Sequence, residues 1–331
     1  MPIRNFGQLS KYFSQANVAD VVGVLPKPDT PMTDLLFPPE RRVQKASPFI
    51  SMRDVQSATG AIPLVRRDGR SVPIDANGAR NLLIEVDPFK PSSFASAKDI
   101  NDLIALGDTA SIQAFLSERI QELRDSVSAS TEVLVRQAMS GQIAYPYSVI
   151  DGQGGKCEVS LGTPHQLKSF RLVNGDIAAV QTMFENALQE HAAKTGTSGR
   201  PVFLMGAAAY SALVDIIVKM GSSAPVVWNS DGLVLLGKYT IKTTGLTYTL
   251  PGSTEAKGII ADNVVRIYDQ SNPGKLIYAA LDDMNANLAP LPFYVTPIET
   301  KDPDGVKLVG SSKPFPALAM SRQSEFAVVT K

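Results

Sequence analysis

The most regular pattern in the chain is a stripe of apolar residues between Thr109 and Gly141. Spacings of three, four or seven residues place these side chains on one face of an α-helix of period 3.6. Asp108 or Thr109 can cap its start, and Gly141 can close its end in the left-handed conformation. At 1.5 Å per residue the helix is roughly 45 Å long, so it is either a spine flanked by thin elements or an ordinary core helix. The stripe consists of Ile112, Leu116, Ile120, Leu123, Val127, Leu134 and Ala138.

The first 45 residues do not have the pattern of a domain. A short helix is predicted over Gln8 to Ala16, and five prolines then occur between residues 26 and 39 with few apolar residues among them. Proline removes backbone donors and disfavours helix at the preceding residue, so this segment cannot bury enough surface to order itself. We therefore expect either a floppy tail or an arm that is held against something else, such as another chain.

Residues 46–92 have the pattern of a long β-hairpin. An Asp68-Gly69 turn lies between β-prone flanks, and this is a strong local hairpin signal. The predicted tip is rich in arginine, with Arg66, Arg67 and Arg70 around Asp68. A lone hairpin is marginal in water, so it must fold either onto its own domain or onto a neighbouring subunit.

The remainder alternates between β and α/β patterns. A second hairpin is predicted over residues 142–161, and helices are predicted over 174–194 and 207–220 around a short buried strand at 201–205. From residue 225 onward the pattern is that of β-strands separated by turns. The lone Trp228 is predicted to be a packing anchor, and Glu132 and Arg136 are expected to form an i,i+4 ion pair on the long helix.

Composition narrows the class of protein. The 331 residues are enough for two or three domains, and an apolar content of 44% is enough for real cores. Lys plus Arg and Asp plus Glu each total 32, so a strong electrostatic grip on nucleic acid or on an anionic membrane is not expected. The single cysteine excludes an intrachain disulfide, and no apolar run predicts a membrane span or a signal peptide. We expect a protein made in the cytoplasm that does not enter a membrane.

Candidate chemistry is scarce. His165, His191 and Cys157 lack the spacing of a zinc site and the context of a nucleophile pair. Gly154-Gly155-Lys156 does not fit the phosphate-loop pattern, because Cys157 follows the lysine where that pattern needs Ser or Thr. Asp282-Asp283 is interpreted as a surface acidic pair and not a cation site. We therefore predict no catalytic residue, no metal and no cofactor.

The order of these parts resembles that of the major capsid proteins of tailed bacteriophages, in particular the lambda-type capsid protein E family. The resemblance covers nearly the whole chain, and its specificity comes from the order of diffuse motifs. The segments that carry it are Gln8-Leu9, Leu36-Phe37, Glu85-Val86-Asp87-Pro88, Thr131 to Leu134, Gln137 to Ile143, Pro201 to Met205, and Phe293 to Thr296 through Asp302-Pro303 to Pro314, Pro316 and Leu318.

The resemblance implies an α+β, Hong Kong 97-like fold with four parts. These are an N-terminal arm at 1–49, an extended loop at 50–92, a peripheral domain with the spine helix at 93–168 and 285–312, and an axial domain at 169–284 and 313–331. The implied function is that of a structural major capsid protein, which self-assembles into pentamers and hexamers of an icosahedral shell around double-stranded DNA. The expected location is the virion, after synthesis in the host cytoplasm.

The resemblance also implies partners. We expect a separate scaffolding protein, since no long charged helix precedes the arm, and a portal protein; the sequence leaves a decoration protein open. Packaged DNA would be contacted non-specifically. The family's extended loop lies over a neighbour's spine helix, which makes the tip arginines and three acidic residues of the helix candidate contacts between subunits. Those acidic residues are Glu118, Glu122 and Asp125.

Two other functions remain open at this point. One is the shell of an encapsulin-like nanocompartment, which would have the same fold. The other is a cytosolic α/β enzyme or ligand-binding protein, which would need turnover that depends on His191 or Cys157.

Overall fold

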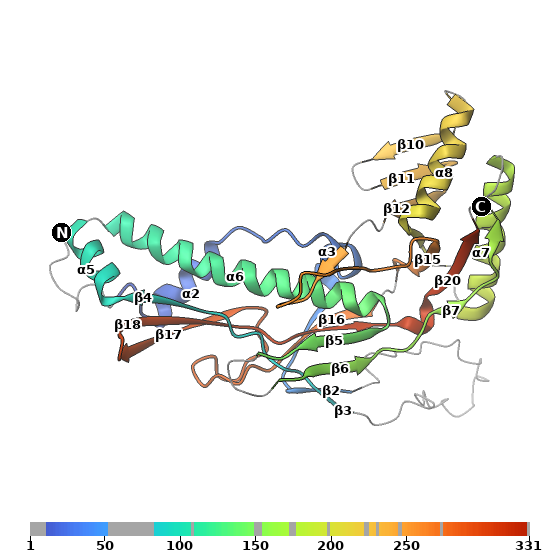
Figure 1. The fold of residues 1–331 in the computed structure, drawn as a ribbon. Coiled ribbons are helices and arrows are strands. Elements are labelled where there is room, and N and C mark those ends of the chain that lie inside the picture. The colour runs from blue at the N-terminus through green and yellow to red at the C-terminus, as the bar shows by residue number, and fades with distance from the viewer. Residues whose placement is uncertain are drawn as a thin grey trace, which may run out of the picture. The chain divides into compact units, whose positions relative to one another are not determined.

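The computed structural model divides into two compact units, each described below by itself (Figure 1). Unit 1 comprises Met1–Ile50, Ile84–Glu132 and Leu276–Phe315, and unit 2 comprises Ser51–Leu83, Val133–Lys275 and Pro316–Lys331. The residues that the structure describes are 11–51, 83–106, 109–148, 154–171, 177–196, 199–221, 225–229, 232–243, 247–271 and 274–329.

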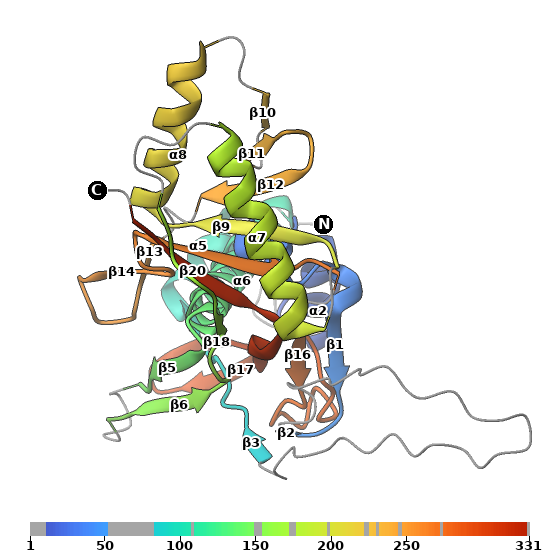
Figure 2. The same ribbon diagram turned by 90° about the vertical axis from the view of Figure 1, so that its right-hand side faces the viewer.

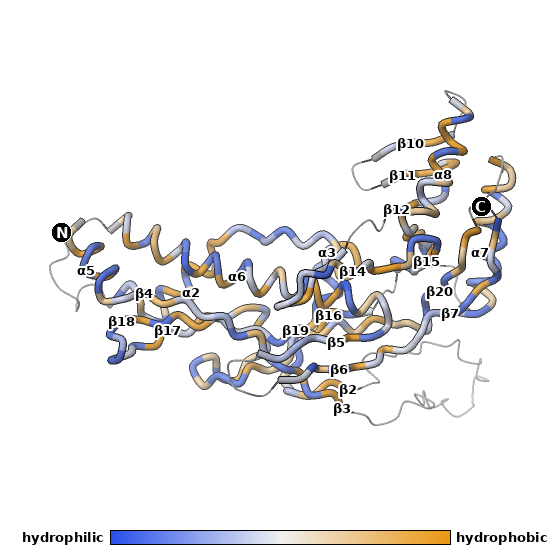
Figure 3. The backbone as a smooth tube through the Cα atoms, viewed as in Figure 1, coloured by the Kyte–Doolittle hydropathy of each residue, from blue (hydrophilic) through white to orange (hydrophobic). Residues whose placement is uncertain are grey.

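The predicted spine is present as α6 (Thr109–Met139), the longest helix among the described residues. All seven members of the apolar stripe are buried, and hydrophobic and hydrophilic residues alternate along the helix (Figure 3). Gly141 adopts the predicted left-handed conformation with φ of +84°. A Cβ there would lie 2.2 Å from the carbonyl oxygen of Gly162, so the turn requires glycine.

The described part of the arm is ordered against its own chain. It contains α2 (Gln15–Val24), α3 (Pro31–Leu36) and the 3₁₀ turn η1 (Pro39–Arg41). Residues 8–10 of the helix predicted over Gln8 to Ala16 lie outside the described residues. Residues 11–14 are not helical, because Ser14 accepts a hydrogen bond from the amide of Asn17 and thereby caps a helix that starts at Gln15. Prolines therefore separate short helices here instead of forming one extended segment.

Apolar burial attaches the arm to the spine within unit 1. Phe13, Val18 and Val21 belong to the same buried cluster as Ile112 and the rest of the stripe up to Leu123. The expectation that the arm could not bury enough surface to order itself is thus corrected, because the surface it needs is supplied by α6 of its own chain.

A buried carboxylate provides the second attachment. Glu132, on α6, is 7% exposed and accepts hydrogen bonds from the amides of Met32 and Thr33, both at 2.9 Å, and from the Thr33 hydroxyl at 2.7 Å. These amides belong to the first turn of α3, where backbone donors have no partner within the helix. Glu132, a residue of α6, therefore caps the N-terminus of α3. The predicted ion pair with Arg136 did not indicate this role.

Small sheets complete unit 1. β4 (Ser92–Ser96), β17 (Tyr294–Lys301) and β18 (Asp304–Ser311) form an antiparallel sheet in the order β17-β18-β4. This sheet and α5 (Ala97–Leu106) contribute buried residues to the same cluster as the stripe. β1 (Arg42–Lys45) pairs in parallel with β16 (Gly274–Ala279), with Arg42 opposite Leu276 and Lys45 opposite Ala279. β19 (Pro314–Leu318) follows β18 in the sequence.

Unit 2 is built on an eight-stranded mixed sheet, with the order β10-β11-β12-β9-β15-β20-β7 and with β8 paired to β20. The α/β pattern predicted the two helices that precede and follow β9 in the sequence, α7 (Ile177–Thr195) and α8 (Ala207–Met220). In Figure 2, α7 lies across the strands of this sheet. The strands are β7 (His165–Gln166), β8 (Phe170–Arg171), β9 (Pro201–Met205), β10 (Val226–Asn229), β11 (Gly232–Leu235), β12 (Tyr239–Thr243), β15 (Val264–Asp269) and β20 (Ser324–Val329).

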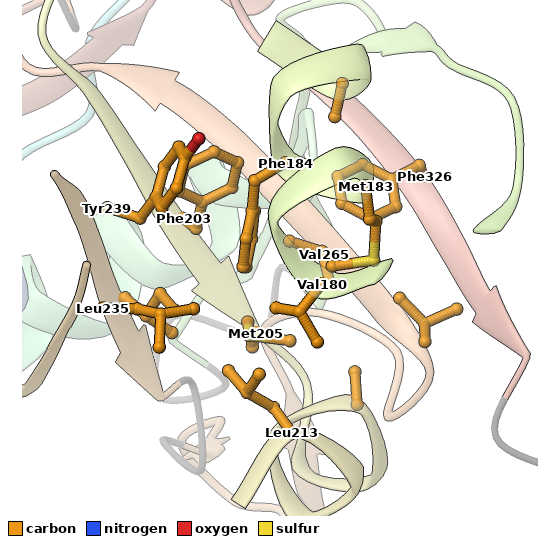
Figure 4. Close-up of a cluster of buried hydrophobic side chains, with 14 of the residues drawn as sticks. Val180, Met183, Phe184, Phe203, Met205, Leu213, Leu235, Tyr239, Val265 and Phe326 are labelled. Carbon is orange, nitrogen blue, oxygen red and sulfur yellow. The ribbon is translucent and has the colours of Figure 1, made fainter. Parts of the chain in front are cut away.

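The core of unit 2 is aromatic at its centre. The ring of Phe184, on α7, lies 4.5 Å from that of Phe203 and stacks on Tyr239 at 5.1 Å between centroids (Figure 4). Leu213 of α8 and Phe326 of β20 belong to the same buried cluster. Both helices therefore bury apolar faces against one side of the sheet, as the periodicity predicted.

Three two-stranded pairs make up the remaining strands of the described residues. The predicted second hairpin is present as β5 (Gln142–Pro146) and β6 (Lys156–Ser160). A further antiparallel pair consists of β13 (Thr247–Thr249) and β14 (Ala256–Gly258). β2 (Phe49–Ser51) pairs with β3 (Leu83–Glu85), and these strands flank the segment predicted to be the long hairpin.

We predict that Glu132→Gln lowers the free energy of unfolding by about 1–3 kcal/mol, because an amide cannot replace all the charge-assisted bonds to α3. The measurement is urea unfolding of the unassembled full chain, with hydrogen exchange of the amides of residues 32–36 as a local probe. Glu118→Gln is the matched control, since it removes the same charge from an exposed position of α6. Equal stabilities of the two variants would contradict the capping role.

Candidate inter-subunit contact surfaces

An acidic stripe lies on the exposed face of α6. Glu118, Glu122 and Asp125 are spaced by four and three residues, which places them on one side of the helix, away from the buried stripe. All three are exposed. Three carboxylates in two turns of helix give this face of unit 1 a local negative charge.

Part of that charge is already paired along the helix. Arg119 Nη1 lies 3.2 Å from Glu122 Oε2, and these side chains are 36% and 54% exposed. Gln121 donates a hydrogen bond of 2.7 Å to Asp125 Oδ1. Exposed pairs of this kind contribute little to folding, so the carboxylates remain able to exchange their partners for an incoming cation.

The positive counterpart predicted from the sequence lies outside the described residues. Arg66, Arg67, Asp68 and Arg70 belong to the segment between β2 and β3. The structure therefore gives the position of the acidic half of the candidate contact and the strands from which the other half departs. Their meeting stays a prediction.

Unit 2 presents an apolar strand edge. β10 ends the eight-stranded sheet and pairs with β11 on one side only among the described strands. Val227 and Trp228 are 58% and 57% exposed. The prediction that Trp228 is a packing anchor is wrong, because an edge strand has a neighbour to cover its side chains on one side only. No charge or proline interrupts Val226–Asn229, although such residues commonly protect exposed edges from pairing.

A tight loop in unit 1 displays a second apolar position. Met284 is 83% exposed, and the loop around it contains Asn287 and Leu288 with φ of 52° and 55°. Asp283 holds the loop, because its carboxylate accepts bonds from the amide of Asn285 at 2.8 Å and from the Thr296 hydroxyl. Asp283, one of the two residues of the predicted surface acidic pair, thus stabilises this loop.

Unit 2 also contains a buried polar cluster. His191, on α7, is 1% exposed, and its Nδ1 lies 2.8 Å from the hydroxyl oxygen of Ser324 on β20. Burial lowers the pKa of His191, while nearby Asp269 acts in the opposite direction. Burial alone would raise the pKa of Asp269, but hydrogen bonds from Ser271 and from the amide of Arg200 outweigh it and lower that pKa. His191 is therefore neutral beside a charged carboxylate and is closed off from substrate.

A buried arginine joins the sheet of unit 2 to the end of the spine helix. Arg266, on β15, is 5% exposed and lies opposite Glu325 on β20. Its Nε donates to Glu325 Oε2 at 3.2 Å, and its Nη1 donates to the carbonyl of Met139, the last residue of α6. A cation at a helix C-terminus complements the helix dipole. No sequence spacing indicated this contact, because its partners are 59 and 127 residues away.

Among the described residues, no group of three or more His, Cys, Asp or Glu could hold a metal ion. Within the same residues, none of the helices is both long enough and apolar enough to span a membrane.

Comparison with solved structures identifies the fold. The chain shares 15% identity and a TM-score of 0.58 with a prophage capsid protein of E. coli CFT073, over 99% of both chains. It shares 11% identity and a TM-score of 0.51 with a phage-related protein of Bordetella bronchiseptica RB50, over 95% of both. The fold is thus the α+β, Hong Kong 97-like fold of tailed-phage capsid proteins. An encapsulin complex of Synechococcus elongatus PCC 7942 is also similar over 95% of this chain and 96% of that one, but 11% identity and a TM-score of 0.39 are too low to support a conclusion.

The family follows from the sequence itself. Residues 14–322 match the family described as phage major capsid protein E, and the chain belongs to this family. No match was found among curated proteins. The chain is therefore a structural protein of the virion capsid, a shell-forming homo-oligomer and not an enzyme. The resemblance noted in the sequence is confirmed.

The lowered pKa of His191 predicts acid sensitivity of unit 2. Below an ordinary histidine pKa of about 6.5, the unfolded chain takes up a proton that buried His191 resists. The free energy of unfolding contributed by this group is complete above pH 6.5 and falls as the pH drops toward the lower folded pKa. Denaturant unfolding at pH 7.5 and pH 5.5 measures the loss.

Substitution of His191 separates this effect from general acid sensitivity. His191→Asn is expected to be less stable at pH 7.5 but to lose less stability on acidification than the native chain. If the variant and the native chain showed the same pH dependence, His191 would not be its source.

Proposed function

We propose that this chain assembles into pentamers and hexamers that close an icosahedral shell around double-stranded DNA. The observation that carries the proposal is the match to the capsid protein E family over residues 14–322. Exposed apolar positions in both units support assembly, because contact with other copies would cover Met284, Val227 and Trp228. Zero formal charge suits a shell that encloses DNA without clamping it.

We propose the following assignment of residues to functional domains. Residues 1–49 form the arm and 50–92 the extended loop, while 93–168 with 285–312 form the peripheral domain. Residues 169–284 with 313–331 form the axial domain. The compact units divide the chain at other points, after Glu132 and before Leu276, so these functional domains would not coincide with the units.

The extended loop is proposed to contact a neighbouring subunit. Three cations within five residues repel one another if the tip is exposed, and guanidinium groups form bidentate bonds with carboxylates. The exposed stripe of Glu118, Glu122 and Asp125 supplies such carboxylates. β2 and β3 support the loop as a projection, because they pair on both sides of the tip segment.

Other partners follow from the same proposal. A separate scaffolding protein would guide closure, and a portal protein would occupy the entry for DNA. Binding of a decoration protein to the outside of the shell is compatible with this proposal. The chain would be made in the host cytoplasm and would contact packaged DNA non-specifically.

A nanocompartment shell is the alternative, and the contents of the shell discriminate the two. We expect particles purified from phage-producing cells to contain double-stranded DNA that is protected from nuclease. The particles are treated with nuclease to remove external DNA, the remaining DNA is measured, and the particles are imaged by electron microscopy. Particles assembled in the absence of phage DNA serve as the control. Uniform shells that hold one cargo protein and no DNA would favour the nanocompartment.

The loop contact predicts a defect in assembly that leaves folding intact. A triple variant with Arg66→Gln, Arg67→Gln and Arg70→Gln is expected to give a folded monomer whose yield of shells is reduced, because the charge pairs with the neighbour are lost. Added salt is expected to lower the yield of the native chain toward that of the variant, because exposed charge pairs are screened. Sedimentation and negative-stain imaging measure the yield under conditions in which the native chain assembles.

The matched control removes three exposed lysines elsewhere, by Lys219→Gln, Lys257→Gln and Lys301→Gln. This control variant alters the net charge by the same amount as the arginine variant but leaves the loop tip unchanged. It is therefore expected to assemble like the native chain. If the arginine variant also assembled normally at every salt concentration, the tip would be a solvated turn. A charge swap that places Glu at one of the three arginines and Lys at Glu118 or Glu122 would identify the acidic stripe as the partner if it restored assembly.

A further inference from the structure

A pocket of about 140 Å³ lies in unit 1 between the arm and the spine helix. Lys27 and Thr30 line it from the arm, and Arg124 and Ser128 line it from α6. Arg42 and Tyr278 line it from β1 and β16. Segments distant in the sequence therefore meet around one small space within a single unit.

The pocket has more cations than its neighbouring carboxylates neutralise. Lys27, Arg42 and Arg124 line it, and no acidic side chain does. Asp34, outside the lining, pairs with Lys27 at 3.0 Å and with Arg42. Glu132, on α6, is occupied by the three donors of α3. Lys27 and Arg42 share the single carboxylate of Asp34, and Arg124 forms no ion pair with a described residue, so the lining cations are not fully neutralised by their partners.

Several donors of the lining have no partner in the part of the chain that the structure describes. Arg124 uses one guanidinium nitrogen for the carbonyl of Leu25 at 3.2 Å, and its remaining N–H groups make no further hydrogen bond there. The hydroxyls of Thr30, Ser128 and Tyr278 likewise make no hydrogen bond to described residues. Burial raises the pKa of Tyr278, so this phenol stays protonated and can donate.

We propose that this pocket binds a tetrahedral oxyanion of the phosphate class and joins the arm to the spine through it. Guanidinium groups match the oxygen geometry of phosphate, and the hydroxyls add neutral donors. The volume is sufficient for one such group. The proposal does not depend on the proposed function, since it concerns a single folded chain.

Bound phosphate would stabilise the arm, because its ligands come from the arm and from α6 together. A ligand that binds only the folded state raises stability in proportion to the logarithm of its concentration. Opening of the short helix α3 would then require loss of the anion as well as of the Glu132 cap. Phosphate is thus expected to slow hydrogen exchange of the amides of residues 32–36.

The test uses the unassembled full chain, inorganic phosphate as the probe, and sodium chloride of equal ionic strength as the reference. Calorimetry is expected to show one phosphate site, and hydrogen exchange is expected to show protection of α3. Arg124→Gln should weaken binding at least about tenfold, the effect of losing one charge-assisted hydrogen bond. Arg119→Gln, on the same helix but outside the lining, should bind like the native chain.

Two further measurements keep the outcome decisive. Ser128→Ala, a small change, should weaken binding a few-fold and replaces Arg124→Gln if that variant does not fold. A short DNA duplex that displaces phosphate would assign the anion to a nucleic-acid backbone, and a duplex that does not would assign it to the free ion. The site is overturned if phosphate acts no differently from chloride, or if Arg124→Gln and Arg119→Gln bind alike.

Discussion

A charged group taken out of water must be supplied with hydrogen bonds, and this requirement shapes the arm. The Glu132 carboxylate is buried on the spine helix, and the first turn of α3 supplies its donors. An isolated helix of six residues is not stable in water, so α3 depends on the carboxylate as much as the carboxylate depends on α3. Because the apolar contacts of α2 fix the preceding part of the arm to the same helix, the proline-rich segment is ordered without a core of its own.

The end of the spine helix in unit 2 depends on a similar arrangement with the opposite sign. Arg266 is buried in the sheet, paired with Glu325, and donates to the carbonyl that ends α6. Removing one partner of such a buried pair leaves an uncompensated charge, which is costly. The spine helix is thus attached in unit 1 through the carboxylate of Glu132 and in unit 2 through the guanidinium of Arg266. Both contacts join the helix to segments that are distant in the sequence.

Periodicity was sufficient for the elements that bury one apolar face. The stripe from Ile112 to Ala138 predicted α6, and the patterns around Phe184 and Leu213 predicted α7 and α8. A short strand such as β1 was missed, because four residues carry too little pattern. The order of elements was enough to indicate the capsid family, since topology survives when individual motifs diverge. Glu132 looked like half of an ordinary surface ion pair, because its partners on α3 are about a hundred residues away and only the folded chain brings them together.

The candidate contacts were predictable to different degrees. The acidic stripe follows from helical spacing once the buried stripe is known, so Glu118, Glu122 and Asp125 could be placed from the sequence. The exposure of Trp228 could not, because a tryptophan in a short β pattern is usually covered, and its position at a sheet edge depends on strand order. That edge has a practical consequence for the free subunit. Apolar association weakens on cooling, so a chain whose exposed strand carries valine and tryptophan but no charge is least cohesive near 0 °C. The unassembled protein is therefore best kept cold, and warming alone favours the meeting of its copies.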